Sequence, residues 1–191
     1  MNERGLESAA KSLMITGASS TGKTTLLNEL TKSLDFLQKP DHTTRDRREG
    51  ETENIDKIFL TVEQFIENHQ NGWYLEPTLE FAVMGANYYG TPASWIEDIN
   101  GETKLAFITI KTVARKIKMA TKNNILWVHL TASESTRNER LIERNTNPAE
   151  LRTRLLQGDS QGESKECDLM IDTSTVSIED ALLIIRRHMA E

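Results

Sequence analysis

The sequence predicts an α/β fold built around a doubly wound parallel sheet, and three observations support this prediction. Apolar runs of strand length recur along the chain, at residues 12–16, 105–110, 125–130 and 168–171. Each run is followed by a segment whose apolar residues have helical spacing. The first run ends in a glycine-rich turn. Strands that alternate with helices in this way are typical of a parallel sheet with helices on both faces.

The helices follow from local patterns. Leucines recur at helical spacing over residues 22–34. Further helices are expected at about 112–119, 133–144 and 178–188, the last of them begun by Ser177. The four leucines of the first helix are Leu26, Leu27, Leu30 and Leu34.

A second, smaller structural unit is predicted between the first and second of these long strands. Thr61 and Gln64 stand in the positions of a capping box, which predicts a short helix over residues 61–68. From residue 73 to residue 89 aromatic and apolar residues alternate irregularly, which indicates short strands of a small sheet. We expect the three tryptophans to pack in the core, namely Trp73, Trp95 and Trp127.

Length and composition favour one soluble domain. The chain has 191 residues, with 23 Lys and Arg against 29 Asp and Glu, for a net charge of −6. An acidic balance argues against broad binding to nucleic acid polymers or anionic membranes. Cys167 is the only cysteine, and no apolar run is long enough to span a bilayer. We therefore expect a cytoplasmic protein, either a monomer or a homodimer.

The turn after the first strand carries a phosphate-binding motif. Gly17, Gly22, Lys23 and Thr24 match the pattern Gly-x4-Gly-Lys-Thr. Small residues let successive backbone N–H groups point at one phosphate cluster, and the following helix adds the positive end of its dipole. The motif predicts ATP as ligand, with Lys23 between the β- and γ-phosphates and the Thr24 hydroxyl on Mg²⁺. The remaining nucleotide-binding residues predicted in this loop and first turn are Ser19, Ser20, Thr21 and Thr25.

A cluster of arginines lies about twenty residues beyond this loop. Arg45, Arg47 and Arg48 occur within four positions. One interpretation is a solvated basic loop. The other is a second phosphate site, because the guanidinium fork binds phosphate with two hydrogen bonds. A GTP switch protein is not expected, since no Asn-Lys-x-Asp motif is present.

With these motifs, the chain resembles the guanylate kinase family over roughly residues 12–188. The resemblance lies in five motifs taken in order: Thr43-Thr44-Arg45 with Arg48 and Gly50-Glu51; Asp56-Lys-Ile-Phe59; Glu80; Asn87-Tyr88-Tyr89-Gly90-Thr91; and Arg140 to Arg144 leading into Arg152-Thr-Arg154. It implies a P-loop kinase fold in a single domain, residues 1–191. An acceptor-binding subdomain would cover about 40–92 and a helical lid about 140–160.

The resemblance also implies roles for single residues. Arg45 and Arg48 would bind the acceptor's phosphate with Tyr89, and Glu80 and Thr91 would contact the acceptor base. Glu51 would belong to the same acceptor-binding set. From the lid, Arg144 and Arg154 would reach the triphosphate, so that the catalytic set is Lys23, Arg45, Arg48, Arg144 and Arg154. Asp172 ends the last strand near the expected adenine pocket, where it could equally cap a helix.

Three positions depart from the family's pattern. Asp41 stands where the family has a serine that donates to guanine O6, and Lys57 replaces a tyrosine that contacts the acceptor phosphate. Thr109 replaces an aspartate near the acceptor ribose and the metal. An amino group on the base would suit Asp41 better than a carbonyl, although a protonated Asp41 or an intervening water would restore guanine. Lys57 remains compatible with phosphate binding.

The function predicted from the sequence is transfer of the ATP γ-phosphoryl group to a small-molecule nucleotide acceptor. This acceptor would be a nucleoside monophosphate, namely GMP, dGMP or a related or modified nucleotide. Two alternatives stay open. One is a sugar-phosphate kinase of the ribose 1,5-bisphosphate type, and the other is a non-catalytic binding module that shares the fold.

Overall fold

The computed structural model describes residues 12–48, 50–76, 79–82, 86–101, 103–121, 124–143 and 166–190. Its larger sheet has five parallel strands in the order β2-β7-β1-β8-β9. The central strand β1 (Ser12–Gly17) lies between β7 (Leu105–Ile108) and β8 (Ile125–Thr131). The edges are β2 (Leu37–Gln38) and β9 (Leu169–Asp172). This confirms the predicted parallel α/β sheet.

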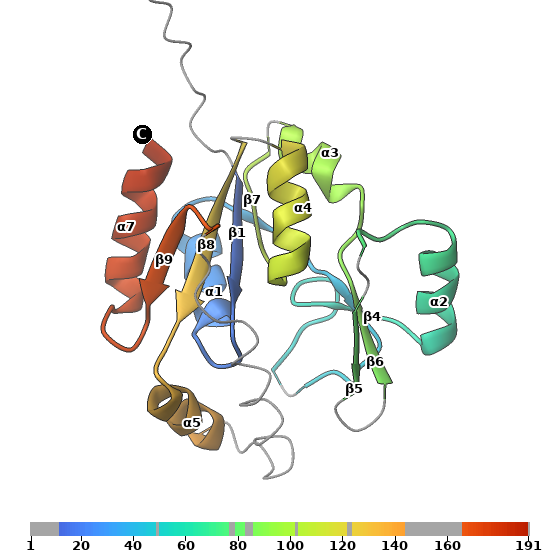
Figure 1. Cartoon of the computed structure of the whole chain (residues 1–191), viewed down its shortest axis with the longest axis horizontal. Coiled ribbons are helices and arrows are strands. Elements are labelled where there is room, and N and C mark those ends of the chain that lie inside the picture. The colour runs from blue at the N-terminus through green and yellow to red at the C-terminus, as the bar shows by residue number, and fades with distance from the viewer. Residues whose placement is uncertain are drawn as a thin grey trace, which may run out of the picture.

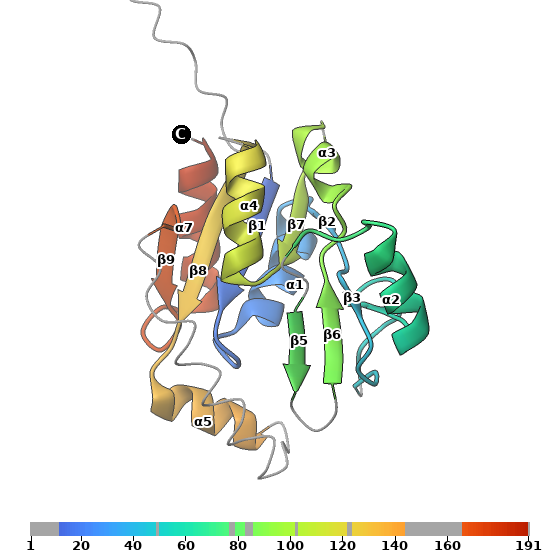
Figure 2. The ribbon, with the colours of Figure 1, turned by 45° about the vertical axis from the view of Figure 1, so that its right-hand side comes forward.

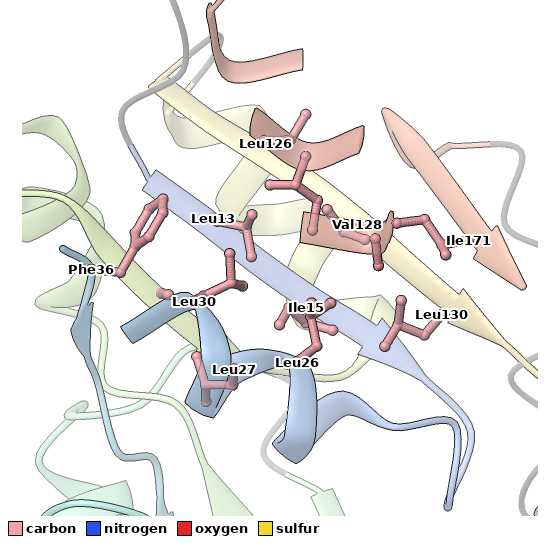
Figure 3. Packing of buried hydrophobic residues seen from close by; sticks show 13 residues of the cluster. Leu13, Ile15, Leu26, Leu27, Leu30, Phe36, Leu126, Val128, Leu130 and Ile171 are labelled. Atoms are coloured by element: carbon pink, nitrogen blue, oxygen red, sulfur yellow. The ribbon is translucent and has the colours of Figure 1, made fainter. Parts of the chain in front are cut away.

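Helices cover both faces of this sheet, as Figure 1 shows. Successive side chains of β1 point to opposite faces. Leu13 and Ile15 pack on the face covered by α1 (Lys23–Ser33) and α7 (Ile178–Ala190). Figure 3 shows this cluster from close by. Met14 packs on the opposite face, against α3 (Trp95–Asn100) and α4 (Lys111–Thr121).

A second sheet has four strands in the order β4-β3-β6-β5. Its strands are β3 (His42–Thr43), β4 (Ile58–Phe59), β5 (Leu79–Ala82) and β6 (Ala86–Gly90). Figures 1 and 2 both place this sheet, together with α2, to one side of the larger sheet. The small sheet that was predicted from residues 73–89 is therefore present, and β3 and β4 extend it.

The helix α2 (Val62–Gln70) begins as predicted. The Thr61 hydroxyl accepts from the backbone N–H of Gln64, and the Gln64 side chain accepts from the backbone N–H of Thr61. Phe65 then packs inward, with its ring stacked on Tyr74 at 4.6 Å and on Tyr88 at 5.3 Å. The aromatic stack holds α2 on the second sheet.

The tryptophan prediction was right for two positions and wrong for one. Trp95 and Trp127 are buried, but Trp73 is 55% exposed. Its neighbour Tyr74 takes the buried position instead, because Tyr74 forms a bridge with Pro92 and successive side chains in extended backbone face opposite ways.

Parallel strands direct their carboxyl ends to one edge of the larger sheet, the lower edge in Figure 1. The turn between β1 and α1 lies there, as does α5 (Glu134–Glu143). In open α/β sheets this edge is where ligands bind. In the part of the chain that the structure describes, no helix has the length and apolar character needed to cross a membrane.

Candidate functional site

The backbone of the turn between β1 and α1 needs both glycines of the sequence motif. Gly17 has φ of +145°, and a Cβ atom there would lie 2.3 Å from the Leu130 carbonyl oxygen. Gly22 has φ of +87° and caps α1. Both conformations disfavour residues with a side chain. The backbone conformation of the turn therefore explains why the motif has glycine at both positions.

Lys23 lies over this turn. Its Nζ donates to the carbonyl oxygens of Gly17 at 2.8 Å and Ala18 at 2.5 Å. The neighbouring Ser20 has φ of +63°, and its Oγ is buried without a hydrogen-bond partner among the described residues. A buried hydroxyl without a partner costs free energy, and a ligand oxygen would satisfy it. The turn is thus suited to bind a phosphate group.

The first turn of α1 offers hydroxyl groups beside this cradle. Thr24 and Thr25 are exposed there, and hydroxyl oxygen is a ligand that suits Mg²⁺. Within the described ranges no three His, Cys, Asp or Glu side chains gather into a metal-binding group. Thr24 therefore remains the residue predicted to ligate the metal.

Arg140 ties the turn to a distant part of the chain. Its Nη1 donates to the Ser20 carbonyl oxygen at 3.1 Å and to Thr173 Oγ1 at 2.9 Å, and its Nη2 donates to the Thr173 carbonyl oxygen at 2.8 Å. Thr173 Oγ1 also lies 3.0 Å from the Thr21 carbonyl oxygen. These contacts fix helix α5 and the segment after β9 against the phosphate-binding turn.

A cavity of about 370 Å³ adjoins this junction. Arg140 and Thr173 were not among the site residues predicted from the sequence. Arg140 opens the run from Arg140 to Arg144 in which the chain resembles the family, and that run was the signal for it. Thr173 carried no such signal. The cavity is lined by Gly22, Thr25, Arg140, Glu143, Thr173, Val176, Ser177 and Ile178.

Asp172 lies beside this junction, where its side chain makes a local hydrogen bond. Its carboxylate accepts from the backbone N–H of Ser174 at 2.9 Å, and the residue is exposed. The predicted place of Asp172 beside a donor base therefore stays a prediction. Arg144 and Arg154, predicted to act from the lid, lie outside the described residues.

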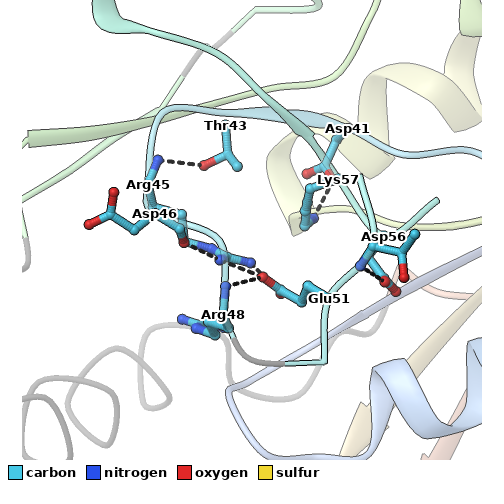
Figure 4. Close-up of polar contacts among 9 residues, drawn as sticks. Asp41, Thr43, Arg45, Asp46, Arg48, Glu51, Asp56 and Lys57 are labelled. Carbon is cyan, nitrogen blue, oxygen red and sulfur yellow. Dashed lines mark hydrogen bonds and ion pairs between the residues drawn. The ribbon is translucent and has the colours of Figure 1, made fainter. Parts of the chain in front are cut away.

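On the second sheet, Arg45 is held in a fixed orientation by Glu51. The two guanidinium nitrogens donate to the two carboxylate oxygens at 2.7 Å and 2.5 Å, and the Arg48 backbone N–H donates to the same carboxylate at 2.9 Å (Figure 4). Arg45 is 9% exposed, and its guanidinium carbon lies 5.5 Å from the centre of the Phe59 ring. Glu51, predicted as a substrate contact, thus positions Arg45 in this structure.

Charge pairing dominates the electrostatics of this turn. Burial by itself would lower the pKa of Arg45, but the hydrogen bonds and charge of Glu51 outweigh it and raise that pKa. Burial would likewise raise the pKa of Glu51, yet the hydrogen bond from Arg45, the backbone N–H of Arg48 and the charges of both arginines lower it. Both groups therefore remain charged, as phosphate binding by Arg45 requires.

Two of the three departures from the family pattern lie next to each other. Lys57 Nζ donates to Asp41 Oδ1 in an ion pair drawn in Figure 4. The Asp41 side chain is 14% exposed and that of Lys57 is 20% exposed. Strands β3 and β4 bring the two residues together, and the Ile58 backbone N–H donates to the Asp41 carbonyl oxygen at 3.0 Å. In the sequence Asp41 and Lys57 are sixteen positions apart and give no sign of this pairing.

The third departure also contacts a predicted site residue. Thr109 Oγ1 lies 3.4 Å from Thr91 Oγ1, and both threonines are buried. The Thr109 backbone N–H donates to the Ile15 carbonyl oxygen at 3.0 Å, close to the start of the phosphate-binding turn. The end of the second sheet therefore joins the ligand edge of the larger sheet at this threonine pair.

The remaining predicted acceptor residues lie on β5 and β6. Tyr89 in β6 pairs with Thr43 of β3, close to Arg45 in the chain. Glu80 lies in β5 opposite Tyr88, and its predicted contact with a base stays a prediction. His42 is buried, and its Nδ1 lies 2.9 Å from the Tyr74 hydroxyl. Burial lowers the pKa of His42 despite the opposing charge of Asp41.

A parallel sheet whose central strand leads through a glycine turn and a lysine into a helix defines a P-loop nucleotide-binding fold, the class to which P-loop kinases belong. Comparison with known families is specific: the family model described as guanylate kinase matches residues 9–191. The chain belongs to the guanylate kinase family.

Individual relatives agree with this assignment. A guanylate kinase of Clostridium tetani is 33% identical over 139 residues, which cover 72% of this chain and 65% of the relative. One of Bacillus cereus is 33% identical over 137 residues, covering 70% of this chain and 65% of that protein. The chain therefore matches slightly less than two thirds of these relatives' length.

Solved structures share the fold. The crystal structure of guanylate kinase from Anaplasma phagocytophilum has a TM-score of 0.65 at 20% identity, and the match covers 96% of this chain and 86% of that one. A gluconokinase from Sinorhizobium meliloti has a TM-score of 0.53 at 14% identity, with 95% and 91% covered. Because proteins with different acceptors share this architecture, the acceptor must be argued from the site.

Proposed function

We propose that this chain is an ATP-dependent kinase that transfers the γ-phosphoryl group to a nucleoside monophosphate. One observation carries the proposal. The chain has two separate arrangements suited to phosphate, a glycine turn with Lys23 on the larger sheet and a buried, oriented Arg45 guanidinium beside the second sheet. A phosphotransferase needs both, because donor and acceptor each bring a phosphate group. Membership in the guanylate kinase family supports the same activity.

The residues would act by positioning and charge rather than by covalent chemistry. Lys23 would leave its carbonyl partners in the turn and bind the β- and γ-phosphates. Arg45, kept in place by Glu51, would hold the acceptor phosphate with Arg48 and Tyr89. Arg144 and Arg154 would add positive charge from the lid.

The donor nucleotide would bind with Mg²⁺, which would supply positive charge to offset that of the phosphates. Thr24 is the residue that would ligate the metal, and water would complete its coordination. Arg140 and the cavity beside Thr173 would take the donor's base, because the cavity adjoins the phosphate-binding turn at Gly22 and Thr25.

A coupled assay of ADP formation tests the proposal. The acceptors would be GMP, dGMP, AMP, CMP, UMP and ribose 1,5-bisphosphate, each with ATP and Mg²⁺. We expect turnover with at least one nucleoside monophosphate. Turnover with the sugar phosphate alone would assign the chain to the sugar-phosphate kinases. ADP formation with none of the acceptors would overturn the kinase proposal and favour a binding module.

The variant Lys23→Ala checks that the glycine turn is the donor site. We expect it to lower kcat by at least about a hundredfold, since removing one preorganised charge from a phosphoryl-transfer site costs that much. Lys32→Ala is a matched control on the same helix, because Lys32 is an exposed partner of Glu29. Activity that survives in Lys23→Ala would contradict the assignment of the turn.

A further inference from the structure

The ion pair Asp41–Lys57 replaces an uncharged arrangement at the acceptor side, and it carries an inference about the acceptor itself. We propose that these two residues act as one recognition unit that favours a purine nucleotide with an amino group, rather than a carbonyl, at position 6. The inference rests on the proposed kinase function and makes its acceptor specific.

The pair lies close to the group that would hold the acceptor's phosphate. Asp41 directly precedes β3, and Arg45 follows the same strand after Thr44. The charge of Asp41 contributes to the raised pKa of Arg45, which places the carboxylate within electrostatic range of that guanidinium. Figure 4 shows the Asp41–Lys57 pair and the Arg45–Glu51 pair in one view. A nucleotide anchored by its phosphate at Arg45 would therefore have the Asp41–Lys57 pair within reach of its base.

The pair offers a defined pattern of donors and acceptors. The Asp41 carboxylate only accepts hydrogen bonds, and the Lys57 ammonium only donates them. Lys57 occupies Asp41 Oδ1, and no further hydrogen bond to either side chain occurs among the described residues. Lone pairs on the carboxylate and N–H groups on the ammonium thus remain for a ligand. The pair offers an acceptor beside a donor.

Purine bases differ in the hydrogen-bond donors and acceptors that they present at positions 6 and 7. A 6-aminopurine presents a donor at N6 beside an acceptor at N7, whereas guanine presents two acceptors, O6 and N7. The amino edge complements Asp41 and Lys57 at both positions. The guanine edge would satisfy Lys57 but would set O6 against the carboxylate. Leaving a buried acceptor unpaired in this way costs about ten- to a hundredfold in affinity.

The two residues must be changed together. Removing one partner of a largely buried ion pair leaves an uncompensated charge, which is strongly unfavourable. In Asp41→Ser alone, the Lys57 ammonium would also be released toward the phosphate site at Arg45. The double variant Asp41→Ser/Lys57→Tyr removes both charges and provides hydroxyl groups that donate to a carbonyl.

Two matched pairs of acceptors test the inference. GMP is compared with 2,6-diaminopurine riboside monophosphate, and IMP with AMP, because each pair differs at position 6 and in the N1 proton that accompanies the carbonyl. The measurements are kcat/KM and the equilibrium Kd. The native chain should prefer the 6-amino member in both pairs. The ratio of 6-amino to 6-oxo activity should fall about ten- to a hundredfold in the double variant. Comparing these ratios cancels the contribution of every unchanged residue.

The outcomes separate this inference from the kinase proposal. If no acceptor turns over, the kinase proposal fails, but Kd values of the native chain still decide the inference. Tighter binding of GMP than of the diaminopurine nucleotide would overturn it, as would an unchanged ratio in a folded double variant. The control removes a comparable ion pair outside the site: Lys39 Nζ lies 2.9 Å from Asp98 Oδ2. Lys39→Met/Asp98→Asn should keep the native preference.

Discussion

Glu51 acts at the scale of one residue, through the orientation of another. Its carboxylate binds both guanidinium nitrogens of Arg45 and the backbone N–H of Arg48. A free arginine side chain has many rotamers, and fixing them before the substrate arrives lowers the entropic cost of binding. We therefore regard Glu51 as a positioning residue for the acceptor phosphate.

The variant Glu51→Gln should weaken this arrangement without changing its shape. We expect stability to fall by about 1–3 kcal/mol, because a hydrogen bond to a charged group is lost from a largely buried arginine. The acceptor KM should rise much more than the KM for ATP, since in the proposed function Arg45 would bind the acceptor phosphate and not ATP. Urea unfolding and steady-state kinetics measure the two effects. Glu29→Gln is the control, because its pair with Lys32 is exposed and worth little.

The same variant gives a pH dependence with a defined sign. The pKa of Glu51 in the folded chain lies below its usual value of 4.5. The unfolded state therefore binds the proton more readily, and the stabilisation is complete above pH 4.5 and is lost as pH falls through the lower folded value. The stability difference between the native chain and Glu51→Gln should be present at pH 7 and vanish in acid. A stability difference that persists in acid would show that it does not arise from the ionised Glu51 carboxylate.

At the scale of elements, the capping box makes α2 the helix with the clearest start. Thr61→Ala should lower the free energy of unfolding by about 1 kcal/mol, because an N-cap hydrogen bond is lost. Ser94→Ala is a matched control: Ser94 caps α3 without a side-chain hydrogen bond. Urea midpoints compare the two. Equal losses in both variants would mean that the capping hydrogen bond of Thr61 adds nothing.

The elements that could be predicted from the sequence share one property. Each is long enough for its pattern of apolar residues to be recognised. Strands β1, β7 and β8 are apolar on both faces, so each produces a continuous apolar run. Strands β2, β3 and β4 have two residues each, which is too short for any alternation to be visible. Helix α3 has six residues and was missed for the same reason.

The candidate site also has a part that could be predicted from the sequence and a part that could not. The phosphate-binding turn could be predicted because its chemistry is local: two glycines, a lysine and a threonine lie within eight positions. The pairing of Asp41 with Lys57 could not, because it depends on the parallel register that sets His42 opposite Ile58. Likewise, Arg140 reaches Ser20 across 120 positions of sequence. Long-range side-chain contacts require the fold first.

At the scale of the whole molecule, ligand binding should be visible as stabilisation. ATP with Mg²⁺ at about a hundred times its Kd should add about 2.7 kcal/mol, because only the folded state binds it. For a chain of this size that corresponds to a rise in Tm of about 5–10 °C. Thermal unfolding with and without the nucleotide measures it, with Lys32→Ala as control. A full shift in Lys23→Ala would contradict the placement of ATP at the glycine turn.

The order of the large sheet has a consequence for how the chain folds during synthesis. Strand β1 is synthesised well before both of its neighbours, β7 and β8. Until residue 108 is available, β1 has no strand on either side, and the carbonyl of Leu130, against which Gly17 packs, does not exist until β8 is made. Contacts so distant in sequence make folding slow. The phosphate-binding turn is thus synthesised well before the strand against which Gly17 packs.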